Sequence, residues 1–439
     1  MIKLMPANPS EKLCYDIEIF GTERFMNFSR AWLIWVVGVS YYFYQYIIRI
    51  SPSVMVVSFS HDFHLTAMSY GLMSSYYFYS YALMQAPVGI IVDKFGAKRP
   101  MVLACSLLAI SCFVFDLMPN GALWDAELLR LLMGLGSAFA FVGVLRLCAT
   151  WFPPEKFPFL CGITNAIGMA AGFVGSASLA WVSEHFGWRH MYLILGVVGI
   201  LIASLLLLFI QDKKGKESHG GASLTLADFW TVFKSPKNWY LGLQGACYWY
   251  PVSGLGALWG TDYISKMYNV PETIAASVSG TLFAGALLGT ILFGWLMSFK
   301  QFKHKLGLIS SVLGVITSAC VVWVKVPIEI MSMLLFLLGM YTAGQVCVYV
   351  LAKEEVKQSL SGAVMGLINS LVISLGAVSQ PLIGMLINSH AGGRMLDGQL
   401  VYNLADFNYA MSSIPLVCGI NLLMSVGYKL WRRRDLTAK

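Results

Sequence analysis

The chain has 439 residues, of which 57% are hydrophobic and 12% are charged, and its formal net charge is +8. A soluble domain would carry about twice this charged fraction, so the composition excludes an ordinary soluble enzyme. The basic surplus does not predict a nucleic-acid partner, because lysines and arginines fall in alternate loops between apolar runs. The nine cysteines include no CxxC pair, and no Walker loop, HExxH motif or nucleophile elbow occurs. We therefore predict no enzyme activity, no metal and no cofactor.

Apolar runs longer than the roughly 18 residues that read as a membrane span follow one another along the chain. They are predicted to be helices, because lipid offers backbone polar groups no partner outside the helix. Twelve spans are predicted, at about residues 31–56, 68–91, 100–118, 126–150, 158–183, 189–210, 238–264, 272–297, 305–324, 328–351, 360–388 and 407–430.

The polar stretch 211–237 separates the spans into two sets of six. Gly162-Ile-Thr-Asn165 in the fifth span matches Gly366-Leu-Ile-Asn369 in the eleventh at an offset of 204 residues, and Gly172 and Gly376 keep this offset. Corresponding glycines predict close helix contacts in both halves. The predicted parts are a lead over 1–27, a first bundle over 28–210, a linker over 211–237, a second bundle over 238–431 and a basic tail over 432–439.

The distribution of lysine and arginine predicts the orientation in the membrane. With the N-terminus in the cytoplasm, 23 of the 30 basic residues fall in cytoplasmic segments and four in outer loops. This bias predicts that both termini are cytoplasmic. The outer loops contain no Asn-x-Ser/Thr sequon, which favours a bacterial inner membrane over the membrane of an acidic organelle.

Three short motifs lie in turns at the ends of predicted spans, and a fourth lies within the fourth span. They are Gly89-x3-Asp93-Lys94-x-Gly96-x-Lys98-Arg99, Arg130-x3-Gly134-x-Gly136-x-Ala138, Trp151-Phe-Pro153 and Gly187-Trp-Arg189. Together with the spans, they resemble the major facilitator superfamily of secondary transporters. The resemblance implies an all-α membrane protein with twelve transmembrane helices in two pseudo-symmetric six-helix bundles, and transport by alternating access through a central cavity.

Within that superfamily the chain is similar to organic-anion symporters, and residues 41–52 of the first span are also similar to amino-acid and peptide carriers. The symporter likeness rests largely on Arg49 and Arg130. Ile48 and Ser137 stand where the symporters carry membrane acids. Proton coupling, exchange and facilitated diffusion therefore all remain open.

Arg49 is the sharpest single signal for a binding site. A charged side chain inside a span costs about 2.5–3.5 kcal/mol on insertion scales and usually faces water or a partner. Gln45 and Tyr42 lie on the same helical face, at i−4 and i−7. We predict that all three contact substrate. The alternative is that Arg49 snorkels to the outer interface.

Arg130 is predicted to lie near Arg49 and to contact substrate, with pairing to Glu127 at i−3 as the alternative. Arg146 follows 16 residues later, about 24 Å along an ideal helix. Both arginines therefore cannot line one cavity at one depth. We predict that Arg146 is a packing residue or part of the inner gate.

The loop after the second span is predicted to control conformational change. Asp93 could pair with a basic residue of the adjoining bundle or lie at a helix N-terminus, which makes a latch that breaks during rocking. Gly89, Gly96, Lys98 and Arg99 belong to the same motif and are predicted to shape the loop. The alternative for Asp93 is a solvated acid in a turn.

In the second half, the counterpart polar residues are pairs at i, i+4 spacing, and we predict that they also contact substrate. They are Gln244 and Tyr248 in the seventh span, and Tyr341 and Gln345 in the tenth. Asn369 and Gln380 are buried amides for which interhelical hydrogen bonding is the leading alternative.

The spans contain three arginines, and no carboxylate lies in their mid-regions. Buried positive charge requires an anion, and arginine binds carboxylates through two parallel hydrogen bonds. We predict a monomeric secondary transporter in a lipid bilayer that carries an organic anion, an amino acid or a small peptide. The alternatives are a multidrug or siderophore exporter of the same fold, and a non-transporting membrane receptor.

Overall fold

The computed structural model describes residues 9–212, 231–297, 299, 302, 305–356, 360–396 and 399–437. Most of the predicted linker and the last two residues of the predicted tail lie outside these ranges. The described part is helical apart from one short hairpin, so the predicted all-α class is confirmed.

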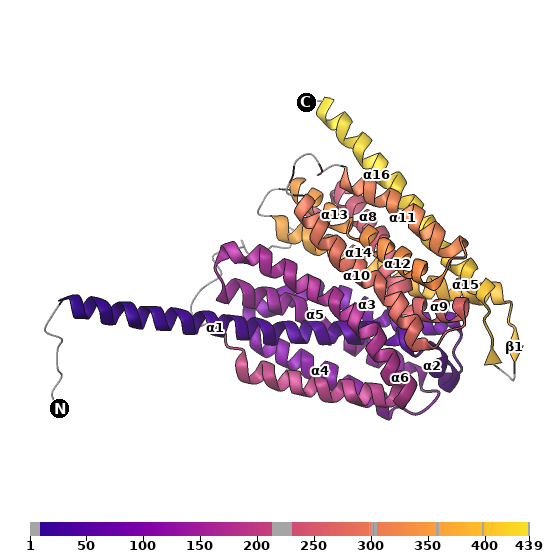
Figure 1. Cartoon of the computed structure of the whole chain (residues 1–439), viewed down its shortest axis with the longest axis horizontal. Coiled ribbons are helices and arrows are strands. Elements are labelled where there is room, and N and C mark those ends of the chain that lie inside the picture. Colours follow the sequence, from indigo (N-terminus) through magenta and orange to yellow (C-terminus); the bar gives the residue numbers. More distant parts are fainter. Residues whose placement is uncertain are drawn as a thin grey trace.

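The first half begins with a long helix that extends away from the rest of the protein at its N-terminal end (Figure 1). Gly187 has φ 80° and ψ 160° and breaks the last helix of this half into two segments. The elements are α1 (Pro9–Ile50), η1 (Ser51–Val54), α2 (Val56–Phe63), α3 (Ala67–Phe95), α4 (Lys98–Leu117), α5 (Leu123–Trp151), η2 (Pro154–Lys156) and α6 (Phe157–Phe209).

The second half contains a π-helix, η3, inside its first predicted span. Its helices are α8 (Pro236–Pro251), η3 (Val252–Trp259), α9 (Gly260–Tyr268), α10 (Glu272–Leu296), α11 (Leu306–Trp323), α12 (Ile328–Thr342), α13 (Gln345–Glu354), α14 (Ser361–Ala391), α15 (Leu404–Met411) and α16 (Ser413–Thr437). Strands β1 (Met395–Leu396) and β2 (Gln399–Leu400) pair antiparallel between α14 and α15.

Nine helical stretches of the described chain are long and apolar enough to cross a membrane. One of them, Pro154–Phe209, covers two of the predicted spans. Two predicted spans are not among the nine: the seventh, which consists of α8, η3 and α9, and the second, α3, whose tyrosines and serines lower its mean hydropathy. The protein is an integral multi-pass membrane protein, and its helices are consistent with the predicted twelve.

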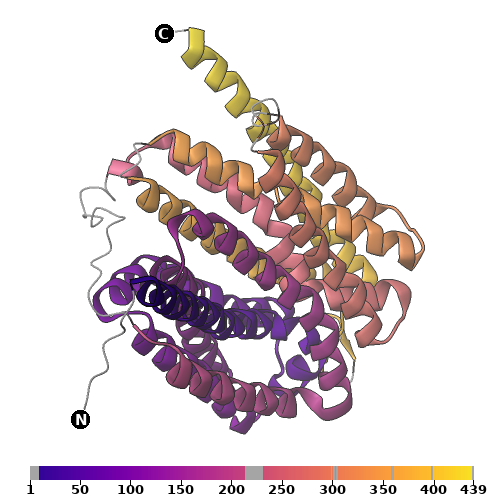
Figure 2. The same cartoon turned by 60° about the vertical axis from the view of Figure 1, so that its left-hand side comes forward.

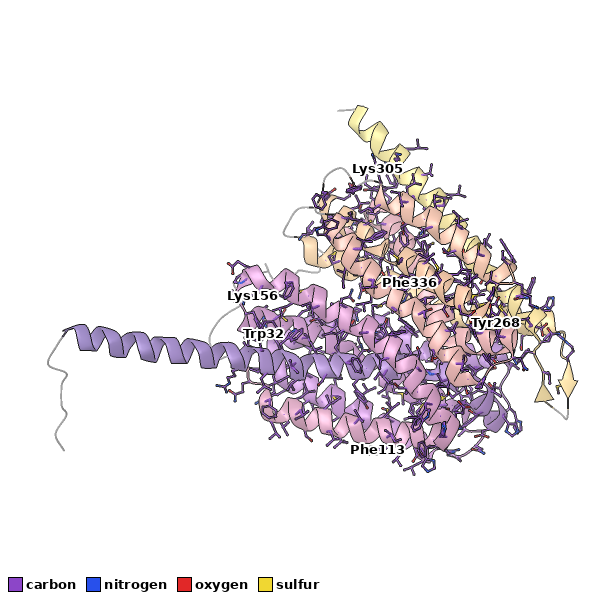
Figure 3. All side chains as sticks on the ribbon, viewed as in Figure 1. Trp32, Phe113, Lys156, Tyr268, Lys305 and Phe336 are labelled. Atoms are coloured by element: carbon purple, nitrogen blue, oxygen red, sulfur yellow. The ribbon has the colours of Figure 1, made fainter. Side chains whose placement is uncertain are left out.

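Figure 2 shows the two halves of the chain as two groups of helices, with α14 of the second group alongside α3 of the first. Lys156 and Lys305 lie at one end of the two groups, and Tyr268 lies at the other (Figure 3). We call the first end the linker end, because Gln211 lies there, and the second the hairpin end, after β1 and β2.

The two halves meet closely at the hairpin end, and the helix axes diverge toward the linker end (Figure 1). A Cβ atom on Gly71 of α3 would lie 2.5 Å from the carbonyl oxygen of Gln380 in α14, and one on Gly384 of α14 would lie 2.3 Å from that of Ala67. The backbones of α3 and α14 are therefore in contact along this seam.

The repeated glycines divide into two kinds. A Cβ on Gly172 or on Gly376 would meet an aromatic ring within 3 Å, so the predicted close contacts are confirmed there. The prediction was wrong for Gly162 and Gly366, where an added Cβ would meet no neighbouring atom within 4 Å. Matching positions in the two halves show that two glycines lie at the same place along their helices. They do not show which face of each helix packs against a neighbouring helix.

Candidate functional site

Arg49 lies at the end of α1 with only 5% of its surface exposed. Its Nη2 donates a long hydrogen bond of 3.4 Å to Gln45 Oε1, and its Nε has no partner. Aromatic rings of α1 and α3 surround the guanidinium, at 4.7 Å from the Cζ atom for Tyr46, 4.8 Å for Tyr81, and 5.8 Å for Tyr77 and Phe78. The rings offer the cation their electron-rich faces, and Arg49 points into the protein rather than toward the outer interface.

Arg130 of α5 is fully buried and lies beside Arg49. Its Nη1 donates to the carbonyl oxygen of Ile48 at 3.1 Å, and its Cζ lies 4.9 Å from the centre of the Tyr77 ring. Tyr77 therefore contacts both arginines. In the described part of the chain Arg130 makes no ion pair with Glu127, the alternative partner that the sequence allowed.

Buried hydrogen-bond donors without acceptors gather around the two arginines. They are Nε of Arg49, Nε and Nη2 of Arg130, and Nε2 of Gln45. The Gln45 Oε1 atom already accepts from Tyr77 at 2.8 Å. No described carboxylate pairs with either arginine. Because a guanidinium stays protonated and an unpaired buried charge costs roughly several kcal/mol, this site is electrostatically suited to an anion. We call Arg49, Arg130, Gln45 and Tyr77 the arginine site.

The arginine site lies beside the seam between the two halves. Tyr46, whose ring faces Arg49, also contacts Phe283 of α10, with ring centres 6.2 Å apart. Tyr42 does not reach the guanidinium and packs instead on Phe141 at 5.2 Å. The structure therefore places the end of α1 against both halves.

A chain of hydrogen bonds crosses the seam closer to the linker end. Asn369 Nδ2 of α14 donates to Gln85 Oε1 of α3 at 3.0 Å. Asn369 Oδ1 accepts from the Tyr349 hydroxyl at 3.0 Å, which accepts from Gln345 Nε2 at 2.9 Å. Gln85 Nε2 donates at 3.4 Å to the carbonyl oxygen of Tyr81, one of the rings around Arg49. We call Gln85, Asn369, Tyr349 and Gln345 the cross-half chain.

The other three predicted residues of the second half form a separate network inside that half. The rings of Tyr248 and Tyr341 lie 5.0 Å apart, and Gln244 Nε2 donates to Ser425 Oγ at 2.9 Å. The remaining bonds join Tyr248 to Gly307 and Ser311, Ser311 to Ser425, and Tyr341 to Cys247 and Asn421. No hydrogen bond or ring contact within the described ranges joins this network to the arginine site.

At the linker end, Asp93 pairs with Arg146 of α5 at 3.4 Å between Oδ1 and Nη1. Both residues belong to the first half, so in this conformation Asp93 does not pair with the adjoining bundle, and its side chain is 68% exposed. Arg146 lies far along α5 from Arg130, as the helix rise predicts.

The rest of this loop is held by Asp212, just after α6. The Asp212 carboxylate accepts from the backbone N–H groups of Ala97 at 2.9 Å and Lys98 at 3.3 Å, and it lies against Gly96, whose φ is 80°. Arg99 is exposed, and a Cβ on Gly89 would meet no atom within 4 Å. The loop is thus fixed through its backbone.

Sequence reasoning missed the contribution of α3. Tyr77, Tyr81 and Gln85 follow one another at i, i+4 and i+8 and present one polar face toward Arg49 and the seam. This spacing is visible in the sequence. The polar face was overlooked because the same stretch contains several other tyrosines.

The sequence model of the Major Facilitator Superfamily matches residues 34–381. Among solved structures, a bacterial homologue of the human lysosomal transporter Spinster, in an inward-facing and occupied conformation, superposes with a TM-score of 0.74 at 17% identity, covering 90% of this chain and 95% of that one. The nucleoside transporter NupG gives a TM-score of 0.70 at 14% identity, covering 90% of this chain and 99% of that one. At these sequence identities, the two structures show that the folds are similar and no more.

Curated relatives match at low identity. The uncharacterized transporter YybO of Bacillus subtilis is 28% identical over 40% of this chain, and the probable galactarate/D-glucarate transporter GarP of Escherichia coli is 29% identical over 38%. Each match spans only 39% of the relative's length. The probable galactarate/D-glucarate transporter GudP of Escherichia coli is 24% identical, over 85% of this chain and 90% of its own. The extent of the family match settles the classification: this chain belongs to the Major Facilitator Superfamily.

Proposed function

We propose that this protein is a secondary transporter that carries a small organic anion with at least one carboxylate across a membrane by alternating access. The observation that carries the proposal is the excess of buried donors around Arg49 and Arg130, which have no anionic partner among the described residues. A bound carboxylate supplies the missing acceptors and the missing negative charge. A cationic cargo would raise the electrostatic cost of the same site.

Arg49 is the primary carboxylate ligand in this proposal. It lies beside the seam, whereas Arg130 is fully enclosed behind Tyr77. Arg130 therefore acts mainly through its positive field and by holding the Ile48 carbonyl next to Arg49. Tyr42, Gln244, Tyr248 and Tyr341 have packing or bundle-internal partners in this conformation and are assigned to support rather than to substrate contact.

The cross-half chain extends the proposed site into the second half. Its amide and phenol groups are hydrogen-bonded to one another in this conformation. The same groups can instead form hydrogen bonds to hydroxyl groups of the substrate. The relatives named for galactarate and D-glucarate transport would carry sugar acids with two carboxylates and several hydroxyls. We therefore propose hydroxylated carboxylic acids as the substrate class and D-glucarate as the first probe.

We further propose that the protein acts as a monomer in a bacterial inner membrane, with the linker end in the cytoplasm. The strong bias of lysine and arginine toward one set of loops supports this orientation. Asp93 and Arg146 are proposed to act together as a latch within the first half, because their pair lies beside the loop that joins α3 to α4.

The test is ligand-induced stabilisation of the purified protein together with uptake into proteoliposomes. D-Glucarate should raise the unfolding temperature, since a ligand that binds only the folded state stabilises it. D-Glucitol, the matching polyol without carboxylates, should not. Arg49→Ala should weaken D-glucarate binding by about 10- to 100-fold, because hydrogen bonds to charged groups contribute about 1.5–3 kcal/mol.

Two further variants sharpen the test. Arg49→Lys keeps the charge but not the planar fork and should bind with intermediate affinity. Lys325→Ala removes a positive charge from an exposed position outside the site and should leave binding unchanged. Equal stabilisation of wild type and Arg49→Ala by every carboxylate tested, with undiminished uptake, would remove the assignment of Arg49.

A further inference from the structure

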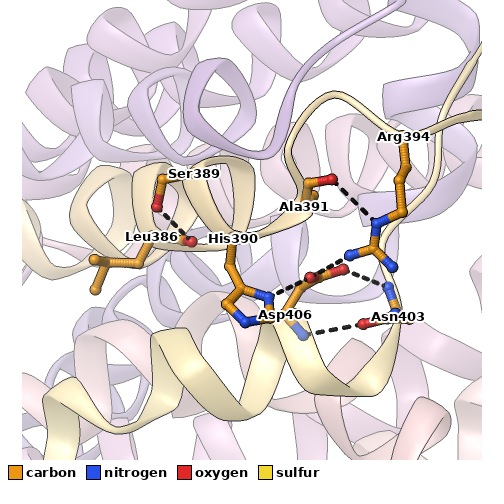
Figure 4. Close-up of polar contacts among 7 residues, drawn as sticks. All are labelled: Leu386, Ser389, His390, Ala391, Arg394, Asn403 and Asp406. Carbon is orange, nitrogen blue, oxygen red and sulfur yellow. Dashed lines mark hydrogen bonds and ion pairs between the residues drawn. The ribbon is translucent and has the colours of Figure 1, made fainter.

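The segment between α14 and α15 forms a closed loop tied to one buried carboxylate (Figure 4). Asp406 is fully buried, and its Oδ1 accepts from His390 Nδ1 at 2.7 Å and from Arg394 Nη2. Its Oδ2 accepts from the backbone N–H of Asn403 at 2.8 Å, while Asn403 Oδ1 accepts from the Asp406 N–H at 3.1 Å. The Asp406 side chain thereby ties together His390, Arg394 and Asn403.

This loop reaches across to the first half through Tyr402. The Tyr402 hydroxyl accepts from the backbone N–H of Ala67 at 3.0 Å and donates to Asn388 Oδ1 at 2.5 Å. Ala67 is the first residue of α3, and a first-turn amide has no acceptor within its own helix. The phenol supplies that acceptor from the opposite half.

The contact lies where the backbones of α3 and α14 touch. Ala67 is the residue whose carbonyl oxygen lies against Gly384 of α14, and Gly71, one turn later, lies against Gln380. Opening the hairpin end must separate these backbones, and it must break the bond between Tyr402 and Ala67. The bonds to Asp406 all lie within the second half and can survive the opening.

We propose that residues 390–396 and 399–406 form a strap that holds the hairpin end closed, with Asp406 as its anchor and Tyr402 as its gate contact. This proposal rests on the proposed function, because a gate has meaning only in a protein that alternates between two conformations. The strap biases the resting protein toward the conformation seen here. Tyr402 acts on transport through the position of α3 and does not touch substrate.

The experiment is hydrogen–deuterium exchange on the full-length protein, comparing wild type with Tyr402→Phe and Asp406→Asn. In Tyr402→Phe, peptides that cover Ala67, Gly71 and Gly384 should exchange about fivefold faster or more, because the loss of the hydroxyl leaves the first amide of α3 without its acceptor and shifts the seam toward its open form. Asp406→Asn should act in the same direction by loosening the anchor. Tyr409→Phe is the matched control, since Tyr409 is half exposed and stacks on His390 with 4.9 Å between ring centres, an arrangement that phenylalanine keeps.

The outcomes separate the strap from the substrate assignment. Unchanged exchange in Tyr402→Phe overturns the strap, whether or not the protein transports D-glucarate. Faster exchange at Ala67 alone, without Gly71 and Gly384, identifies a local cap and also overturns it. Where uptake is measurable, Tyr402→Phe should lower the KM for substrate added at the hairpin end by about threefold or more, with little change in maximal rate. Faster exchange along the seam without any uptake supports the strap and contradicts only the substrate assignment.

Discussion

A guanidinium group buried in a helical bundle is destabilising unless a negative charge compensates it. It stays protonated, and hydrogen bonds to neutral acceptors offset only part of the free energy of removing it from water. Arg130 illustrates this imbalance, because it has one oxygen partner, the Ile48 carbonyl, while two of its three nitrogens have none. No described carboxylate pairs with it, so its positive charge is uncompensated in this conformation.

Replacing Arg130 should therefore separate stability from binding. Arg130→Met keeps most of the volume and removes the charge, so the unfolding temperature of the ligand-free protein should rise by a few degrees. Replacing buried ionic groups by apolar ones of similar size often stabilises by about 1–4 kcal/mol. The additional stabilisation by D-glucarate should shrink at the same time. Thermal unfolding with and without ligand measures both, and a less stable ligand-free variant that still responds fully to D-glucarate would contradict the argument.

Isolated charges in apolar runs could be found from the sequence because they are chemically exceptional there. Arg49 and Arg130 were predicted to lie near each other, and both contact Tyr77. The direction of ordinary polar residues was harder to predict. Spacing at i, i+4 shows that Gln244 and Tyr248 share a helix face, but not that this face points toward Ser311 and Ser425.

At the scale of elements, a glycine allows two helices to pack closely in each half, and the two helix pairs correspond to each other. Gly134 of α5 lies where a Cβ atom would be 2.0 Å from the Tyr77 carbonyl oxygen of α3. In the second half, a Cβ on Gly339 of α12 would lie 2.0 Å from the Leu282 carbonyl oxygen of α10. Both glycines let two backbones touch, as small residues do in membrane helix pairs.

Gly339→Ala should consequently destabilise the second half by about 2 kcal/mol, the middle of the range for overpacked interiors. Gly294→Ala is the matched control on α10, since no atom lies within 4 Å of its added Cβ, and alanine there should leave stability unchanged or raise it slightly. Thermal unfolding of the two purified variants compares them directly. Equal stability would mean that α10 and α12 separate at little cost.

Breaks within the helices were only partly predictable. The interval between the fifth and sixth predicted spans falls on Gly187, whose positive φ makes the break physically necessary. The π-helix η3 was not predicted, because a π turn changes the hydrogen-bond pattern without changing hydrophobic length. The interruption between α12 and α13 at Ala343 and Gly344 was missed for the same reason.

The whole molecule has one asymmetry that apolar patterning alone does not specify, which is its direction across the bilayer. Apolar length predicts that helices cross the membrane but is the same in either direction. Positive charge near the helix ends determines the direction, because basic loops are retained in the cytoplasm. Of the described basic residues, Lys156 and Lys305 lie at the linker end (Figure 3), while β1, which directly follows Arg394, lies at the hairpin end (Figure 1).

This argument predicts the behaviour of reporter fusions in bacteria. Alkaline phosphatase, which is active only after export, should be inactive when fused after Lys439 and active when inserted between β1 and β2 in the hairpin loop. Green fluorescent protein should give the opposite pattern, because it matures in the cytoplasm. The two reporters control for each other's expression. If alkaline phosphatase fused after Lys439 is active, the proposed orientation is wrong and the linker end faces outward. The proposed latch of Asp93 and Arg146 would then lie on the outer side of the membrane, and the strap at Tyr402 would close the cytoplasmic side.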